Sequence, residues 1–370
     1  MTSVKENEYI TIGSQDMVNP GSTTETSSWH LDKIGQLALS KSANGSKLTG
    51  KGVDVYILDS GIHYEHKEFN GRALYPGCDP IDKLYHQNQA GRDCQGHGTH
   101  VAGLVAGNST GVANGATLFS VRILNCAIQA TEATLIHGIM CVVNHRKNRN
   151  ETRAIINLSI AGAQTTLAIN KSLQSALDND IIIIASAGNG DAGFRLVSYD
   201  SCKAYPAGYP GVINVGSTDV NNNALMGEFD GRTYITNMGK CLDVFAPGYK
   251  ILSSDICPLG PCQSDNDECI GGKAYDNTCK KVRTGTSQSA PIVAGATALL
   301  LEKCPHLTHI ETRIMLRYFL SISKVRFCKS FEYLKEKLSF LDVIITVINT
   351  HDHLLYIGNL SSTDYCSLFM

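Results

Sequence analysis

Short apolar runs alternate along the chain with segments of helical periodicity, and this pattern limits the possible folds. The strand-length runs are 53–58, 118–124, 154–160 and 181–188. Segments 133–146 and 167–180, which lie between them, have apolar residues at helical spacing. Strands that are apolar on both faces must be covered on both faces, as in parallel sheets. The pattern therefore predicts an α/β fold, a doubly wound, mostly parallel sheet with helices on both faces, and sites at the carboxyl ends of the strands.

Four short polar segments fall where the predicted strands end or the predicted helices begin. They are Asp59-Ser60-Gly61, residues 96–103 around His97, Ala187-Gly188-Asn189, and residues 285–291 around Ser287. Pro291 is tolerated only near a helix start, so that helix should begin close to Ser287. Each segment alone has an ordinary explanation as a turn, a loop or a helix N-cap. Together they bring an Asp, a His, an Asn and a Ser to one edge of the predicted sheet.

These residue types suit nucleophilic catalysis. A serine hydroxyl is a weak nucleophile at neutral pH and needs a neighbouring base. His97 would accept the proton of Ser287, and Asp59 would hold the imidazole and stabilise its cation. The Asn189 side chain and the Ser287 main-chain N–H would form an oxyanion hole.

The four segments resemble the signature blocks of the subtilase family. DSGI, HGTHVAG, AGN and GTSQSAP match its motifs, and the order Asp, His, Ser is the subtilisin order. The stretches WHLDKI, NLSIAG, YPAGYPGVINVGSTD and LDVFAPG are similar to those of the proteinase K group. The cysteine pattern is most similar to that of an animal convertase branch. The resemblance implies a subtilisin-like fold and a serine endopeptidase that acts on proteins or peptides.

The resemblance also implies where a substrate would bind. One edge would be formed by Ile128, Gln129 and Ala130, in place of the glycine-rich stretch of proteinase K-like enzymes. The S1 pocket would be formed by Ser159, Ile160, Ala161, Gly162, Ala187 and Gly188. These walls are small or apolar and contain no carboxylate, so we expect an apolar or aromatic P1 residue to be preferred over Arg or Lys.

Thirteen cysteines are present, and four of them cluster at Cys257, Cys262, Cys269 and Cys279. A zinc site is the first alternative, but the cluster has no CxxC pair and no histidine within it, which favours disulfides and an oxidising compartment. The resemblance implies the disulfides Cys94–Cys126 and Cys202–Cys241, and we expect two more within the cluster. No pairing is predicted for Cys78, Cys141, Cys304, Cys328 and Cys366, and the odd total leaves one thiol unpaired or bonded to another chain.

The resemblance suggests a structural calcium ion, with no cofactor needed for the chemistry. The matching positions are Pro210, Val212 and Asp243, whose oxygens suit calcium. The alternative is that Asp243 only caps a turn. Among the remaining histidines, His100 should be structural, whereas His63 and His66 should be exposed.

Charge and hydropathy argue against two other classes of protein. The 370 residues include 32 basic and 34 acidic ones, a net charge of −2, which disfavours nucleic-acid binding. No stretch reaches the roughly 18 uninterrupted apolar residues of a membrane span. We expect a secreted protein from its cysteines, although residues 1–28 contain no apolar run that would serve as a signal peptide.

The chain divides into a flexible lead-in (1–28), a subtilisin-like peptidase domain (29–320) with a Cys-rich insertion (256–282), and a tail without family match (321–370). Subtilases usually carry an inhibitory prodomain, and 28 residues are too few for one. The chain would then be either a mature-like form or an incomplete gene product, and an inhibitory prodomain would be a partner that is not present in it. Two alternatives to a secreted endopeptidase remain: a catalytically weak or inactive binding protein with the same fold, and an intracellular subtilase. The cysteine content argues against the second.

Overall fold

The computed structural model describes most of the chain between residues 48 and 322 and a few short pieces outside it. The described residues are 9–11, 28–35, 48–85, 90–162, 165–190, 200–222, 224–229, 232–261, 269–270, 273–319, 321–322 and 354–355. The predicted tail, 321–370, therefore lies outside them except for two dipeptides. Within these ranges, no helix has both the length and the apolar character required to cross a lipid bilayer.

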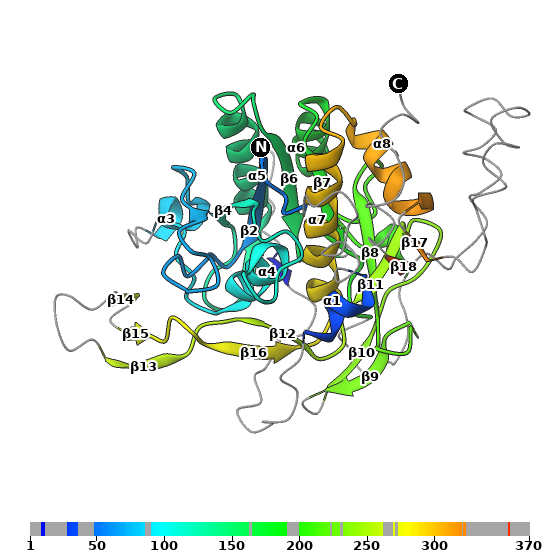
Figure 1. The fold of residues 1–370 in the computed structure, drawn as a ribbon. Helices are drawn as coiled ribbons and strands as arrows, with labels where there is room; N and C mark the ends of the chain where they lie inside the picture. The colour runs from blue at the N-terminus through cyan, green and yellow to red at the C-terminus, as the bar shows by residue number, and fades with distance from the viewer. Residues whose placement is uncertain are drawn as a thin grey trace, which may run out of the picture.

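A nine-stranded sheet forms the centre of the molecule (Figure 1). From one edge to the other its strands are β17 (Ser321–Ile322), β18 (Leu354–Leu355), β11 (Val244–Pro247), β8 (Ile213–Thr218), β7 (Ile182–Ser186), β6 (Arg153–Leu158), β2 (Val53–Asp59), β4 (Thr117–Arg122) and β3 (Ala73–Leu74). All neighbouring pairs are parallel except β17 with β18. The predicted mostly parallel sheet is confirmed, and the predicted strand runs 53–58, 118–124, 154–160 and 181–188 correspond to β2, β4, β6 and β7, respectively.

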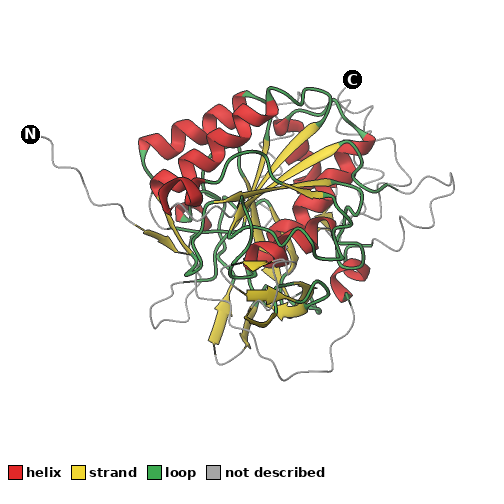
Figure 2. Ribbon diagram, turned by 90° about the vertical axis from the view of Figure 1, so that its left-hand side faces the viewer, coloured by secondary structure: helices red, strands yellow, loops and turns green. Residues whose placement is uncertain are grey.

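Helices cover both faces of this sheet, as Figure 2 shows. The helices α4 (His97–Ala106) and α7 (Thr286–Lys303) pack on one face, and α5 (Glu132–Arg146) and α6 (Leu167–Asp178) pack on the other. Along β2 the buried side chains alternate: Val55 and Ile57 join the first core, whereas Tyr56 and Leu58 join the second. Because both faces of the strand are buried, its sequence is apolar at almost every position.

The remaining elements lie around the sheet. They are α1 (Trp29–Lys33), α3 (Pro80–Tyr85), η1 (Ser201–Lys203), α8 (His309–Ile314), the π-helix η2 (Met315–Phe319), and the antiparallel pairs β9 (Met226–Phe229) with β10 (Arg232–Ile235) and β12 (Ile251–Ser254) with β16 (Lys280–Arg283). A further antiparallel pair joins β1 (Tyr9–Thr11) to β5 (Gln129–Thr131). Residues 9–11, expected as part of a flexible lead-in, are thus a strand.

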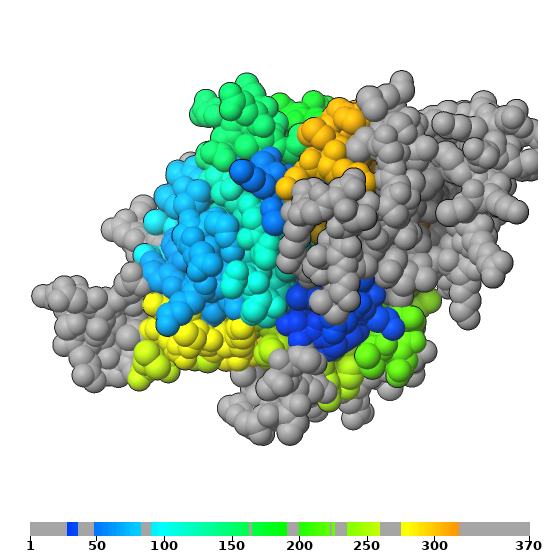
Figure 3. Space-filling model, in the orientation of Figure 1, coloured from blue at the N-terminus to red at the C-terminus, as the bar shows by residue number. Residues whose placement is uncertain are grey.

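The predicted insertion at 256–282 contains a small antiparallel sheet. Its strands are β13 (Pro258–Pro261), β15 (Lys273–Tyr275) and β14 (Cys269–Ile270). In Figure 1 these strands extend from the body of the molecule beyond β12 and β16. The space-filling view shows the yellow atoms of this region directly below the blue and cyan residues that follow β2 (Figure 3). The insertion therefore borders the segment that carries the end of β2.

Candidate active site

The carboxyl edge of the sheet brings the three predicted catalytic residues into the same region of the molecule. Asp59 is the last residue of β2, His97 is the first residue of α4, and Ser287 is the second residue of α7. Helices α4 and α7 pack together on the same face of the sheet, in contact with β2. This placement agrees with the rule that sites in parallel α/β sheets form at the strand ends.

Asp59 and His97 form a buried hydrogen-bonded pair. The Nδ1–H of His97 donates to Oδ1 of Asp59 across 2.8 Å, and both side chains are fully buried. The same carboxylate oxygen accepts the main-chain N–H of Ser60 at 2.7 Å. A carboxylate in contact with Nδ1 fixes the tautomer in which Nε2 is the basic nitrogen, as a general base requires.

Ser287 is bound to the strand end that follows β6. Its hydroxyl donates to the main-chain oxygen of Ser159 (3.1 Å), while the Ser159 hydroxyl donates to the main-chain oxygen of Ser287 (2.9 Å). The second bond has a local cause, because Pro291 lacks the N–H that would otherwise bind the Ser287 carbonyl within α7. To lose its proton to His97, the Ser287 hydroxyl must turn away from Ser159.

The side chain of Asn189, in the loop after β7, is oriented by Thr286, the first residue of α7. The amide oxygen of Asn189 accepts the main-chain N–H of Thr286 (2.8 Å) and the Thr286 hydroxyl (3.0 Å). That hydroxyl in turn accepts the main-chain N–H of Gly188 (3.1 Å). Because the side-chain oxygen of Asn189 is bound to Thr286, the NH₂ group of the same amide points away from Thr286 and can donate to another acceptor. Gly285 has φ +144°, and a Cβ there would lie 3.0 Å from this NH₂ group, so glycine keeps the space open.

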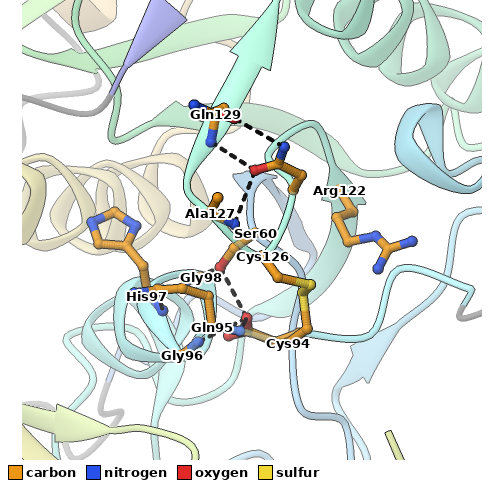
Figure 4. The surroundings of a disulfide bond; sticks show 12 residues. Ser60, Cys94, Gln95, Gly96, His97, Gly98, Arg122, Cys126, Ala127 and Gln129 are labelled. Atoms are coloured by element: carbon orange, nitrogen blue, oxygen red, sulfur yellow. Dashed lines mark hydrogen bonds between the residues drawn. A yellow bond between two sulfur atoms is a disulfide. The ribbon is translucent and has the colours of Figure 1, made fainter. Parts of the chain in front are cut away.

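A disulfide fastens the loop before His97 to the turn before the proposed substrate edge (Figure 4). It joins Cys94 to Cys126, whose Cα atoms are 5.4 Å apart. In the turn, the Asn125 side-chain oxygen accepts the main-chain N–H groups of Ala127 and Gln129, each at 3.0 Å. The histidine loop and the entrance to β5 are therefore held in one covalently linked unit.

The predicted substrate edge is occupied by another part of the chain. β5 pairs antiparallel with β1, in the register Tyr9 with Thr131, Ile10 with Ala130, and Thr11 with Gln129. Ile128 precedes the strand with φ +60° and is buried. An extended peptide that adds a strand to a sheet edge is a common mode of recognition, and here the chain's own segment takes that position.

The two predicted walls of the S1 pocket lie against each other. A Cβ on Gly188 would be 3.3 Å from the Cβ of Ala161, and Gly162 forms an isolated bridge with Tyr205. Ser159, Ile160 and Ala187 are fully buried behind them. Sequence reasoning missed Asn237, whose amide donates to the Ala187 oxygen (2.7 Å) and accepts the Gly190 N–H (3.0 Å). No motif in the sequence marks this residue, because it comes from a different segment.

Four disulfides join two described cysteines each. Two of them, Cys94–Cys126 and Cys202–Cys241, are the pairings implied by the family resemblance. Cys257 pairs with Cys279 inside the predicted cluster, while Cys262 lies outside the described residues. Cys78 and Cys141, for which no pairing was predicted, form a disulfide that joins the loop before α3 to α5. Their 63-residue separation explains why no local pattern indicated the pair.

The expectation that His63 and His66 are exposed is wrong, since each is 99% buried. His63 Nε2 lies 2.6 Å from the side-chain oxygen of Asn277, and His66 Nε2 lies 2.8 Å from the main-chain oxygen of Cys279. The disulfide-linked insertion therefore covers both rings. Burial lowers the pKa of His66 below its usual value. His100 is structural, with Nε2 3.1 Å from the main-chain oxygens of Ile251 and Lys281.

The residues matched to a calcium site do not fit a calcium ion in this structure. Oδ1 of Asp243 is ion-paired with Arg313 (2.9 Å) and Arg317 (3.2 Å), and Oδ2 accepts the main-chain N–H of Asn214 (3.0 Å). A divalent cation at this carboxylate would meet two guanidinium groups. Pro210 is exposed and Val212 is buried. Across the described residues, no group of three or more His, Cys, Asp or Glu side chains is arranged to hold a metal.

Comparison with known proteins identifies the relatives of this chain. Residues 50–321 match the model of the subtilase family. The chain is 32% identical over 300 residues to an extracellular serine proteinase of Thermus sp. (strain Rt41A), covering 80% of this chain and 62% of that protein. It is 33% identical over 276 residues to alkaline serine exoprotease A of Vibrio alginolyticus, covering 74% and 43%.

Two further comparisons agree. The chain is 31% identical over 295 residues to proprotein convertase subtilisin/kexin type 9 of Rattus norvegicus, covering 79% of this chain and 38% of that protein. The crystal structure of a cold adapted subtilisin-like serine proteinase aligns with a TM-score of 0.64 and 30% identity, covering 89% of this chain and 97% of that one. The chain thus spans less than two thirds of the length of these curated relatives. The matched family model, the relatives and the shared fold establish that this chain belongs to the subtilase family.

Proposed function

We propose that the protein is a serine endopeptidase. The observation that carries the proposal is the buried hydrogen bond between Asp59 and His97, combined with the placement of Ser287 at the start of the neighbouring helix. A buried Asp–His pair beside a serine is the arrangement that converts a hydroxyl into a nucleophile.

The residues act in sequence. His97 Nε2 takes the proton of the Ser287 hydroxyl as its oxygen attacks the scissile carbonyl, and the carbonyl oxygen becomes an oxyanion. The Asn189 NH₂ group and the Ser287 main-chain N–H donate to that oxyanion. His97 then returns the proton to the leaving amine, which departs and leaves an acyl group on Ser287. Water, deprotonated by His97, attacks the acyl carbon. The bond from that carbon to the Ser287 oxygen breaks, and His97 returns the proton to the serine as the acid product leaves.

The pocket walls support a preference for apolar or aromatic P1 side chains. Ala161 and Gly188 face each other without a carboxylate between them. The disulfides and the extracellular relative support secretion. Calcium is not proposed at Asp243, because its carboxylate is bound by arginines.

A second candidate is a binding protein with this fold and little or no catalysis. One observation favours it: the Ser287 hydroxyl donates to Ser159. Labelling with a fluorophosphonate probe distinguishes the two, because only an activated serine reacts. We expect the parent protein to be labelled and Ser287→Ala to remain unlabelled with an unchanged circular dichroism spectrum. If the folded parent protein is not labelled, the endopeptidase proposal is excluded and the binding function remains.

A further inference from the structure

Asp93, four residues before His97, is a buried carboxylate that belongs to none of the catalytic motifs. It is fully buried and accepts five hydrogen bonds. Oδ1 accepts the Ser60 hydroxyl and the main-chain N–H groups of Gln95 and Gly96, each at 2.9 Å. Oδ2 accepts the main-chain N–H (2.9 Å) and the hydroxyl (2.6 Å) of Thr99. These donors come from the strand end that carries Asp59 and from the helix start that carries His97.

The contacts of Asp93 join the two halves of the Asp59–His97 pair. The Ser60 hydroxyl, which donates to Asp93, accepts the main-chain N–H of Gly98 at 2.9 Å, and both residues appear side by side in Figure 4. A Cβ on Gly98 would lie 2.1 Å from the main-chain oxygen of Gly61. The turn after Asp59 therefore packs directly on the first turn of α4. Asp93 also replaces the missing side-chain cap of α4, whose N-cap residue is Gly96.

All five donors to Asp93 are neutral, so its negative charge is not cancelled by an ion pair with them. The neighbouring charges are paired among themselves: Asp255, which borders Gly96, binds Arg283 (2.8 Å) and Lys281 (3.4 Å). Glu65 binds Arg92 and lies 3.3 Å from His63, whose main-chain N–H reaches Thr99. Burial raises the pKa of Tyr275, and the charge of Asp93 raises it further.

His97 stands at the positive N-terminal end of α4, where the helix dipole disfavours a protonated ring. Asp59 opposes this effect through its direct hydrogen bond, and Asp93, which accepts the main-chain N–H groups of Gly96 and Thr99 on either side of His97, places a second negative charge at this helix start. We propose that Asp93 is a positioning residue of the active site, which fixes the His97 helix against the Asp59 turn and whose charge favours the imidazolium formed when His97 takes the Ser287 proton. This inference rests on the proposed function.

Two variants separate the two roles. Asp93→Asn removes the charge and presents an NH₂ group to donors. We expect kcat to fall roughly 10- to 100-fold, and the acidic limb of the kcat/KM profile to move to lower pH by about half to one unit. The limb moves down because His97 loses stabilisation of its protonated form. Ser60→Ala keeps the charge but cuts the link to Gly98, so it should lower kcat and leave the limb in place.

Asp54→Asn is the matched control. Asp54 is buried near the end of β2 opposite Asp59, where Arg149 binds it at 2.6 Å, so this variant also loses a buried carboxylate, but at a site away from His97. Its acidic limb should equal that of the parent. A folded Asp93→Asn protein with the parent's limb would overturn the electrostatic role. If Asp93→Asn does not melt cooperatively, unchanged kcat in Ser60→Ala would overturn the positioning role.

A measurement that does not depend on activity distinguishes failure of the endopeptidase proposal from failure of the Asp93 proposal. NMR titration of the His97 ring in a Ser287→Ala background needs no catalysis. There, Asp93→Asn should lower the pKa of His97 relative to Asp54→Asn. If the parent protein is inactive but this difference is found, the endopeptidase proposal fails, while the effect of the Asp93 charge on the His97 ring stands.

Discussion

The hydroxyl of Thr286 donates to the side-chain oxygen of Asn189 across 3.0 Å, and this contact fixes which side of the Asn189 amide carries the NH₂ group, the donor that we propose for the oxyanion. The interaction spans 97 residues of sequence, from the loop after β7 to the first residue of α7. Orientation of a donor before substrate arrives is what makes an oxyanion hole effective.

The first prediction concerns this donor. Asn189→Ala should lower kcat by roughly 10²–10³ with little change in KM, because the lost hydrogen bond forms fully only in the transition state. Thr286→Val removes the hydroxyl that orients the amide and should have a smaller effect in the same direction, while Thr286→Ser should retain activity. Steady-state kinetics on a peptide substrate measures this. Wild-type turnover in Asn189→Ala would show that the amide is not a donor.

The second prediction concerns β1, the strand that pairs with β5 at the proposed substrate edge. If peptides bind to this edge, they must compete with residues 9–11 for it. Deletion of residues 1–11 should lower KM several-fold and leave kcat unchanged, because only the binding step involves the competition. Deletion of residues 1–8, which keeps β1, is the matched control. Equal KM values for the two truncated proteins would contradict the competition.

The third prediction concerns P1 specificity. The small walls around Ala161 and Gly188 should favour Phe, Tyr or Leu at P1, and a peptide library read by mass spectrometry would reveal the preference. Ala161→Asp places a carboxylate beside the pocket and should increase cleavage after Arg and Lys. Dominant cleavage after Arg by the parent protein would refute this description of the pocket.

The fourth prediction concerns stability in acid. His30 is fully buried, with Nε2 2.9 Å from the main-chain oxygen of Thr110, and burial lowers its pKa to about 4. Between about pH 6.5 and 4 the unfolded chain binds a proton at this residue and the folded chain does not. Stability is therefore retained above pH 6.5 and is lost as the pH falls, by up to roughly 3 kcal/mol.

His30→Gln preserves a donor for Thr110 and removes the titration. Its free energy of unfolding, measured in urea at pH 7, 5.5 and 4.5, should fall less steeply with acidification than that of the parent protein. His306→Gln, at an exposed histidine, is the control and should follow the parent curve. Parallel curves for His30→Gln and the parent protein would exclude His30 as the source of the loss.

Local sequence pattern determined the main elements of this protein. The β-branched run that ends in Asp59 indicated a strand buried on both faces, and the small residues after His97 and Ser287 indicated the starts of closely packed helices. In a parallel α/β sheet, strand ends and helix starts fall on one edge whatever the details of packing. The position of Asp59, His97, Asn189 and Ser287 at a common edge was therefore predictable without coordinates.

Tertiary structure decided which side chains from distant segments meet. The sequence places Asp243 in a family motif, yet the fold sets Arg313 and Arg317 against it from 70 and 74 residues away. It buries His63 and His66 under an insertion more than 200 residues later, and it gathers Ser60 and Thr99 around Asp93. Periodicity reports only whether a residue faces the core, because it reflects the geometry of one element. The partner of a buried polar group depends on how elements pack, and its hydrogen bonds are completed only there.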